Sequence, residues 1–215
     1  MTLRKKSAFY ILILAILCSC NDGFTVKKEG YFKIDFPKKE YITFNEPSFP
    51  YSFEYPVYAR ITKESSFPGE NNDSPYSIDI DFPQFKGKIF ISYKNIAGVS
   101  VYKVKRPGGG YRDSTASNDF DKMINDAYKL TYKNDIKAQS IRDSVMHTPN
   151  GLTGIYFQLS GNVATANQFL ISDTTKHFLR GALYFDATPN EDSLRPVNSF
   201  LKEDMKHIIN TLKWK

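Results

Sequence analysis

Cysteine and tryptophan are nearly absent from this sequence. Its two cysteines among 215 residues, Cys18 and Cys20, lie close to the N-terminus, and its one tryptophan is Trp214. The rest of the chain therefore has no thiol to form a disulfide, to act as a nucleophile or to bind zinc. Secreted domains that depend on disulfides are much smaller, so we expect a hydrophobic core to stabilise this chain without them.

The sequence also lacks the run of about 20 apolar residues that a membrane-spanning helix needs. Its longest apolar run, residues 8–17, has ten residues and follows the three basic residues 4–6. This arrangement is typical of a secretory signal peptide. The run ends in Leu17-Cys18-Ser19-Cys20, which resembles a bacterial lipobox because a small residue directly precedes the cysteine. We expect cleavage after Ser19 and lipid attachment at Cys20; an ordinary signal peptide is the alternative.

One domain is expected to follow the signal peptide. Residues 1–19 form the peptide, residues 20–29 a lipidated tether, and residues 30–215 a domain large enough for a substantial core. The net charge of the full sequence is +6, and without residues 4–6 it is +3, from 26 basic and 23 acidic residues. So small an excess does not indicate a nucleic-acid partner.

The sequence patterns of common enzyme and metal sites are missing. The motifs HExxH, CxxC and GxSxG do not occur. His147, His177 and His207 follow one another at intervals of 30 residues. We expect two of them on different strands and the third on the polar side of the last helix, an arrangement that does not form a zinc site.

Two further patterns are better explained by structure than by chemistry. Residues 108–110 are glycines, but no lysine follows them as in a phosphate-binding loop, so a flexible loop is expected. Asp79 and Asp81 alternate with apolar residues, which predicts the solvated face of a strand rather than a catalytic carboxylate pair. We therefore expect no catalytic residue, no cofactor and no metal, and the chain is not expected to be an enzyme.

Hydrophobic periodicity predicts strands, a helix, further strands and a last helix. Alternation predicts strands over residues 51–61, 77–82, 88–94, 140–148, 152–160, 165–174 and 177–187. Apolar spacing from Phe120 to Leu130 predicts a helix that ends before Asn134, with Thr115 or Ser117 as N-cap. A second helix is predicted over residues 194–212, with Pro196 in its first turn. This order indicates an α+β domain in which helices pack on an antiparallel sheet.

Residues 30–56 are rich in proline and aromatic residues, which predicts an extended arm laid over the domain. Aromatic side chains are enriched at interface hot spots. The candidate partner-contact residues are therefore the aromatic ones of this arm: Tyr31, Phe32, Tyr41, Tyr51 and Tyr55. The alternative is that the arm only seals the core of its own domain.

Several stretches are similar to one known family. They are residues 30–37 (GYFKIDFP), 50–56 (PYSFEYP), 126–133 (DAYKLTYK), 165–175 (TANQFLISDTT), 177–185 (HFLRGALYF) and 189–194 (PNEDSL). They resemble the D-type gliding-motility lipoprotein family (GldD) of the Bacteroidota, over nearly the whole chain after Cys20. The order of strands and helices also resembles the PsbP/Mog1-like sandwich, a fold-level likeness that does not give function.

The resemblance implies a membrane-anchored accessory component of the gliding machinery, which is linked to type IX secretion and contacts other envelope proteins. It brings no catalytic residues. Only Asp22 is acidic directly after Cys20, so the acidic cluster of a surface-export tag is missing. We therefore expect a lipid-anchored protein that faces the periplasm, at the outer membrane. A periplasmic ligand- or glycan-binding lipoprotein is the alternative.

Replacing Cys20 by alanine is expected to leave an unacylated precursor that keeps its signal peptide. A buried CH₂ group contributes ~0.8 kcal/mol to membrane binding, so the two or three acyl chains of a lipoprotein hold it firmly where one chain does not. Mass spectrometry of the wild-type protein should find acyl chains on Cys20. An unmodified Cys20 in the wild type would refute the lipidation hypothesis.

Overall fold

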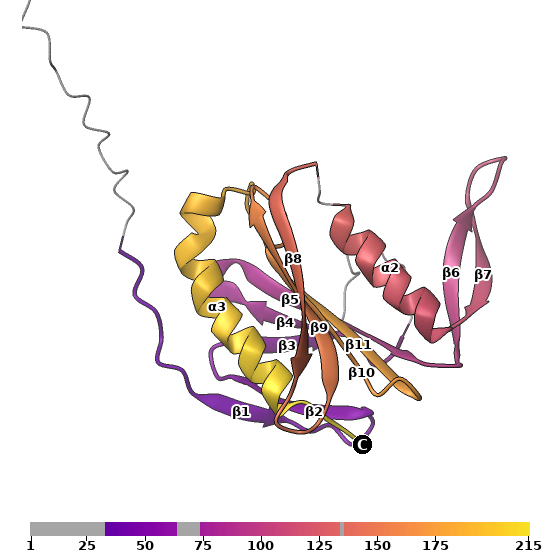
Figure 1. Ribbon diagram of the computed structural model, residues 1–215, viewed down its shortest axis with the longest axis horizontal. Helices are drawn as coiled ribbons and strands as arrows, with labels where there is room; N and C mark the ends of the chain where they lie inside the picture. The colour runs from indigo at the N-terminus through magenta and orange to yellow at the C-terminus, as the bar shows by residue number, and fades with distance from the viewer. Residues whose placement is uncertain (1–32, 64–73, 134–135) are drawn as a thin grey trace, which may run out of the picture. The chain divides into compact units, whose positions relative to one another are not determined.

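Alternating apolar residues place seven strands in one antiparallel sheet, in the order β3-β4-β5-β11-β10-β9-β8. This computed structural model describes residues 33–63, 74–133 and 136–215, and residues 35–215 form one compact unit. The strands, visible in Figure 1, are β3 (Arg60–Lys63), β4 (Ile78–Phe82), β5 (Gly87–Asn95), β8 (Ala138–His147), β9 (Thr153–Gly161), β10 (Asn167–Ser172) and β11 (His177–Phe185). Six expected strands are thereby confirmed to within two residues at each end.

Two meanders, β3–β5 and β8–β11, make up this sheet, and the pairing of β5 with β11 joins them. Gly181 lies on β11 at this seam. A Cβ atom added there would meet the ring of Phe169 at 2.2 Å. The absence of a side chain on residue 181 therefore lets an aromatic ring from β10 pack directly on the backbone of β11.

One face of the sheet packs against helix α3 (Glu191–Thr211) and a small sheet of three strands in the order β1-β2-β12. These strands are β1 (Tyr41–Phe44), β2 (Tyr51–Pro56) and β12 (Lys213–Trp214). Leu201 and Met205 of α3 are fully buried and join Ile80, Ile89 and Phe53 in the larger core. Each such side chain contributes about 1.5–3 kcal/mol when it leaves water.

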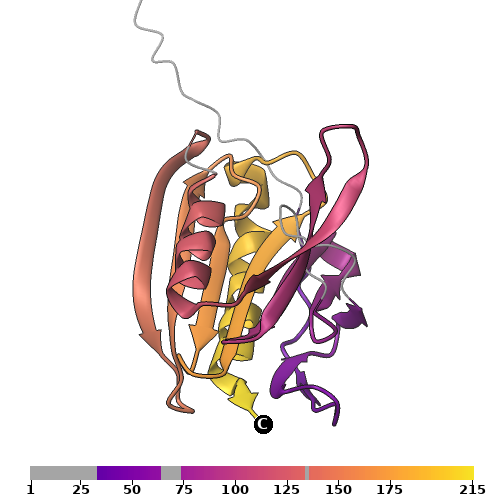
Figure 2. The same ribbon diagram turned by 90° about the vertical axis from the view of Figure 1, so that its right-hand side faces the viewer.

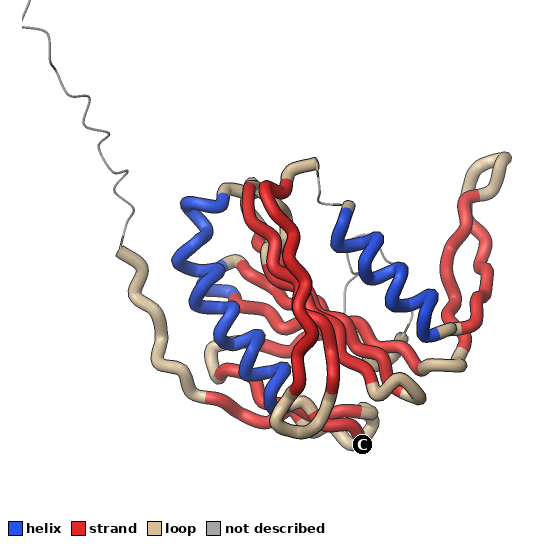
Figure 3. Tube along the Cα trace, in the orientation of Figure 1, coloured by secondary structure: helices blue, strands red, loops and turns tan. Residues whose placement is uncertain are grey.

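The opposite face of the sheet packs against helix α2 (Phe120–Tyr132). Met123 and Ala127 of this helix contact Phe157, Leu170 and Phe178 in a second, smaller core. Figure 3 shows the two helices on opposite sides of the sheet. The expected fold class, an antiparallel sheet with helices packed on it, is confirmed. No helix among the described residues is long and apolar enough to cross a membrane.

Helix α2 begins at Phe120 as expected, but its N-cap and the start of α3 differ from the prediction. Asp119, rather than Thr115 or Ser117, caps α2, since its side chain accepts a hydrogen bond from the Lys122 amide at 3.0 Å. Asn190 caps α3 in the same way through the Ser193 amide, also at 3.0 Å. Helix α3 therefore starts three residues before the expected position 194, and Pro196 lies beyond its first turn.

The expected arm is in fact a β-hairpin followed by a change of sheet. Strands β1 and β2 pair from Tyr41↔Pro56 to Phe44↔Phe53. The strand expected over residues 51–61 is broken after Pro56, where the Ala59 amide donates to the Pro56 carbonyl in a turn. Proline has no amide hydrogen to continue a ladder, so the chain leaves the small sheet here and enters the large one as β3.

The expected solvated position of Asp79 is wrong. Its side chain has no exposed surface, and the ammonium group of Lys88 on the neighbouring strand β5 lies 2.8 Å from Oδ2. The same lysine lies 3.2 Å from Asp81, which stays partly exposed. Alternation gives the face on which a carboxylate lies but not what covers that face, and here Lys88 and the sheet cover it.

A second buried carboxylate, Asp204, connects α3 to the segment before β3. Its side chain is fully buried and accepts hydrogen bonds from Lys39 at 2.6 Å, Tyr41 at 2.9 Å and Tyr58 at 2.6 Å. Burial, followed by the bond to Asp204, raises the pKa of both tyrosines. The phenols therefore remain protonated donors over the whole physiological range.

The same segment has a second contact with α3 one turn further along the helix. The ring of Tyr41 stacks on His207 with 3.6 Å between ring centroids, and His207 Nε2 lies 2.7 Å from Glu54 Oε2. Lys39 also lies over the ring of Phe200, 4.0 Å from its centroid. These polar and aromatic contacts add to the apolar packing of Phe53 and fix the segment from Lys39 to Tyr58 to α3.

Replacing Asp204 by alanine is expected to destabilise the domain by about 3–5 kcal/mol, because two phenols and an ammonium group lose their buried acceptor. The matched control is Glu203→Ala, which removes the exposed neighbouring carboxylate and should change the free energy of unfolding by less than about 0.5 kcal/mol. Urea unfolding followed by circular dichroism measures both. Equal midpoints for the two variants would contradict this role of Asp204.

Candidate functional site

The structure divides the expected partner-contact residues into three groups. Tyr31, Phe32 and the lipidation site Cys20 lie outside the described residues. Tyr51 is fully buried in the larger core, so it is not available to a partner, and the alternative that the arm seals its own domain holds for this residue. Tyr41 and Tyr55 are half-buried. Beside Tyr55 on the neighbouring strand lies Ile42, which is 45% exposed.

A more exposed candidate surface is the β6–β7 hairpin, which is not part of either larger sheet. Strands β6 (Val99–Lys105) and β7 (Tyr111–Ser117) pair with each other from Val99↔Ser117 to Lys105↔Tyr111. They form a two-stranded sheet of their own. Figures 1 and 2 show the hairpin extending away from the rest of the domain. An isolated two-stranded hairpin is only marginally stable in water.

The surface of this hairpin combines exposed apolar groups with positive charge. Val99 is 67% exposed, Val101 37% and Tyr111 66%. Residues 99–117 contain four basic residues and one acidic residue, Asp113. Apolar and aromatic groups surrounded by basic ones are typical of a surface that binds a partner of opposite charge.

The base of the hairpin is firmly attached to the domain through Asn118, which is 7% exposed. Its side chain donates to the Asn95 carbonyl at 2.9 Å and accepts from Ser100 Oγ at 2.6 Å. Its backbone exchanges hydrogen bonds with Ala97 and Gly98, both at 2.8 Å. The two ends of the hairpin therefore lie side by side at a fixed place on the domain.

The sequence interpretation recognised the glycines at the tip of this hairpin but not the hairpin itself. Gly109 and Gly110 have φ values of 89° and 74°, which favour glycine, and the Arg106 amide bonds to the Gly110 carbonyl across the turn. The missed signal was the pair of similar-length polar and β-branched runs on either side of RPGGG. Ser100 and Lys103 have the spacing of an SxxK motif, but neighbouring side chains of a strand alternate, so they lie on opposite faces of β6.

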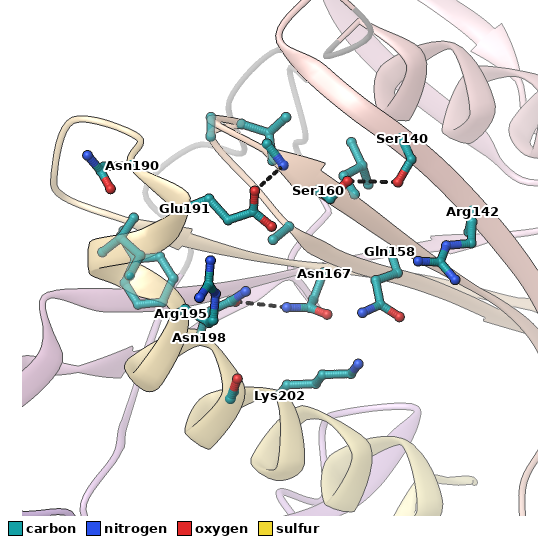
Figure 4. Close-up of a pocket in the computed structure, with 18 residues that line it drawn as sticks. Ser140, Arg142, Gln158, Ser160, Asn167, Asn190, Glu191, Arg195, Asn198 and Lys202 are labelled. Carbon is teal, nitrogen blue, oxygen red and sulfur yellow. Dashed lines mark hydrogen bonds between the residues drawn. The ribbon is translucent and has the colours of Figure 1, made fainter. Parts of the chain in front are cut away.

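A polar pocket of about 220 Å³ lies between the first half of α3 and strands β8, β9 and β10. Figure 4 shows the amide side chains of Gln158, Asn167 and Asn198 inside it, with Arg142 on one side and Lys202 on the other. At its far end Glu191 accepts a hydrogen bond from the Gly161 amide at 2.8 Å. No pattern in the sequence indicated this pocket, because its walls come from five separate elements, α3 and strands β8 to β11.

The three histidines have separate structural surroundings. His147 lies exposed at the end of β8, and His207 stacks on Tyr41, half-buried rather than on the expected polar side of the helix. His177 is 3% exposed. Its Nδ1 lies 2.6 Å from the Tyr93 hydroxyl and its ring stacks on Trp214 with 4.9 Å between centroids. Among residues 33–63, 74–133 and 136–215, no three potential metal ligands come together.

These elements define the class of protein: an antiparallel α+β domain with a helix on each face of its sheet and a basic hairpin beside it. The chain belongs to the family of the gliding motility lipoprotein GldD, whose family model matches residues 21–214. The resemblance inferred from the sequence is thereby confirmed. The chain is accordingly a lipoprotein of the cell envelope that takes part in gliding motility.

Among solved structures, the chain is similar to the solution structure of cyanobacterial PsbP (CyanoP) from Synechocystis sp. PCC 6803. The likeness has a TM-score of 0.44 and 8% sequence identity, and it covers 88% of this chain and 99% of that one. It is too distant to bear on the fold or the function. No curated protein matches the chain.

The domain is expected to become less stable as the pH decreases, and His177 is expected to cause part of this loss. Burial lowers the pKa of this imidazole, and the nearby Asp173 carboxylate opposes the shift without cancelling it. Below a pH of about 6.5, the ordinary pKa of histidine, the imidazole of His177 binds a proton in the unfolded chain but stays neutral in the folded chain. The stabilisation is therefore complete above that pH and is lost as the pH falls toward the folded-state pKa.

This loss is at most about 1.4 kcal/mol per pH unit. Urea midpoints at pH 7.5 and 5.5 should differ more in the wild type than in His177→Gln, whatever the stability of the variant at pH 7.5. The control is His147→Gln, which changes an exposed imidazole and should keep the wild-type difference. If His177→Gln showed the same difference in urea midpoint as the wild type, the pH dependence would come from other titrating groups.

Proposed function

We propose that this lipoprotein is a non-catalytic accessory component of the gliding-motility machinery, linked to type IX secretion, that acts by holding other envelope proteins. Family membership supports the part in gliding. The proposed anchor is the lipid on Cys20, with the domain facing the periplasm at the outer membrane. A permanent anchor suits a fixed binding position better than a freely diffusing enzyme.

The observation that carries this proposal is the exposed β6–β7 hairpin. Its Val99, Val101 and Tyr111 side chains contribute nothing to either core, so their exposure is not explained by folding. A partner that covered this face or extended the two strands would supply the contacts that a lone hairpin lacks. The basic residues around it favour an acidic protein surface as that partner.

The contact residues predicted from the sequence do not all support this proposal equally. Tyr31 and Phe32 remain proposed contacts, as does the half-buried Tyr55. The Tyr41 hydroxyl donates to the Asp204 carboxylate and its ring stacks on His207, so replacing Tyr41 tests stability as well as binding. The structural partners of Tyr93, His177 and Asp204 support a non-catalytic role, because these buried polar groups serve the core.

The alternative function is that of a ligand- or glycan-binding lipoprotein. The polar pocket beside α3 favours it, since cationic and amide side chains line one small cavity. The pocket and the hairpin lie on different elements, so the two functions are compatible.

A strain that lacks the chain is expected to lose colony spreading and movement over glass, and to secrete less through the type IX pathway. Wild-type chain should restore all three. A chain in which an Asn-Gly turn joins Gly98 directly to Asn118 should not, because the contact surface is gone while the fold is kept.

Two controls separate loss of binding from loss of folding. The melting temperature and circular dichroism of the excised chain should match the wild type, and its level in the membrane fraction should be unchanged. Tyr31→Ala, which leaves the Asp204 contacts intact, tests the N-terminal segment separately. Spreading by the clean deletion strain would refute the proposed function; full rescue by the excised chain would refute only the hairpin as its contact surface.

A further inference from the structure

The polar pocket beside α3 contains amide NH₂ groups that have no hydrogen-bond partner among the described residues, and buried Asn167 fixes one of them in place. Asn167 is 1% exposed. Its Oδ1 accepts from the Tyr156 hydroxyl at 2.8 Å, and its Nδ2 donates to Asn198 Oδ1 at 2.8 Å. Because the oxygen of Asn198 is occupied, its amide nitrogen is left to donate into the pocket. Within the described part of the chain, neither this nitrogen nor the Gln158 amide has a side-chain partner.

The pocket also carries positive charge without a matching carboxylate. Arg142 on β8 and Lys202 on α3 both line it, and in Figure 4 Lys202 extends from the helix toward the strands that carry Gln158 and Arg142. Among the described residues no carboxylate lies within 4.0 Å of either cation. Of the other two charged side chains, Arg195 pairs with Asp192, and Glu191 keeps its negative charge at the far end of the pocket, where it accepts from the Gly161 amide. The lining therefore carries three positive charges and one negative charge.

The electrostatic state of Lys202 agrees with a missing counter-charge. Burial, and then the nearby Lys206, lowers the pKa of its ammonium group, and Glu203 offsets this only in part. An anion bound in the pocket would stabilise the charged form of the lysine. The guanidinium group of Arg142 offers the planar, two-pronged geometry that carboxylate and phosphate groups prefer.

We propose that this pocket binds one anionic sugar unit. The acid group would lie between Arg142 and Lys202, and the hydroxyl groups would bond to the amides of Gln158 and Asn198. A bare inorganic anion would leave those amides unused, and a neutral sugar would leave both cations unpaired. The volume of about 220 Å³ is below the roughly 300–1,000 Å³ of pockets for drug-sized ligands, which suits a single unit or the end of a chain.

Titration of the purified, acylated chain in detergent micelles tests this inference independently of motility. The probes are D-glucuronate and D-glucose 6-phosphate as the two acidic sugars, with D-glucose and acetate as their neutral and sugar-free counterparts. Calorimetry should detect saturable binding of at least one acidic sugar with a dissociation constant below about 1 mM. The tighter of the two identifies the acid as carboxylate or phosphate. Glucose and acetate should each bind at least about tenfold more weakly.

Variants then assign the binding to this pocket. Arg142→Gln and Lys202→Gln should each weaken binding of the acidic sugar by at least about tenfold, because each removes a charge-assisted contact. Lys129→Gln, on the exposed side of α2, is the matched control and should leave it unchanged. The inference fails if neither acidic sugar binds at 10 mM, if acetate or glucose binds as tightly as the acidic sugars, or if both pocket variants bind like the wild type while melting normally.

Discussion

The N-terminal part of this domain depends on one buried carboxylate, Asp204. It lies on the apolar face of α3, beside Met205, where isolation of a charge from water would cost several kcal/mol. Three donors offset that penalty only when they arrive together: Lys39, Tyr41 and Tyr58. The segment that carries them is therefore held on the helix by one shared acceptor, and its strands β1 and β2 cover part of the larger core.

Stability in this molecule is concentrated in the sheet and in what covers its two faces. Among the described residues the β6–β7 hairpin contributes to neither core, and Asn118 holds its base. Regions with few buried contacts are where proteins most often place their binding residues, because substitutions there leave the fold intact. The same division applies to α3: its apolar side packs in the core, and Asn198 and Lys202 on its polar side line the pocket.

Local patterns in the sequence predicted the elements well and the environment of individual side chains poorly. Alternation located the strands of the large sheet because apolar residues at every second position face a core. It misplaced Asp79, since the pattern cannot say whether the other face is also covered. It did not predict the β6–β7 hairpin, because no side chain of either strand is buried and neither face is marked as a core face. The role of Asp204 depends on residues far away in the chain, and the periodicity of one helix carries no information about such partners.

The distance along the chain between Tyr41 and Asp204 has a consequence for folding during synthesis. These partners are 163 residues apart. At about 5–20 residues per second, the aromatic hairpin of β1 and β2 emerges roughly 8–30 s before the helix that completes it. For that time Phe44, Tyr51 and Phe53 lack the part of their core that α3 supplies. Native topology of this kind folds slowly, so the nascent chain is a natural client for a chaperone that shields its first aromatic segment.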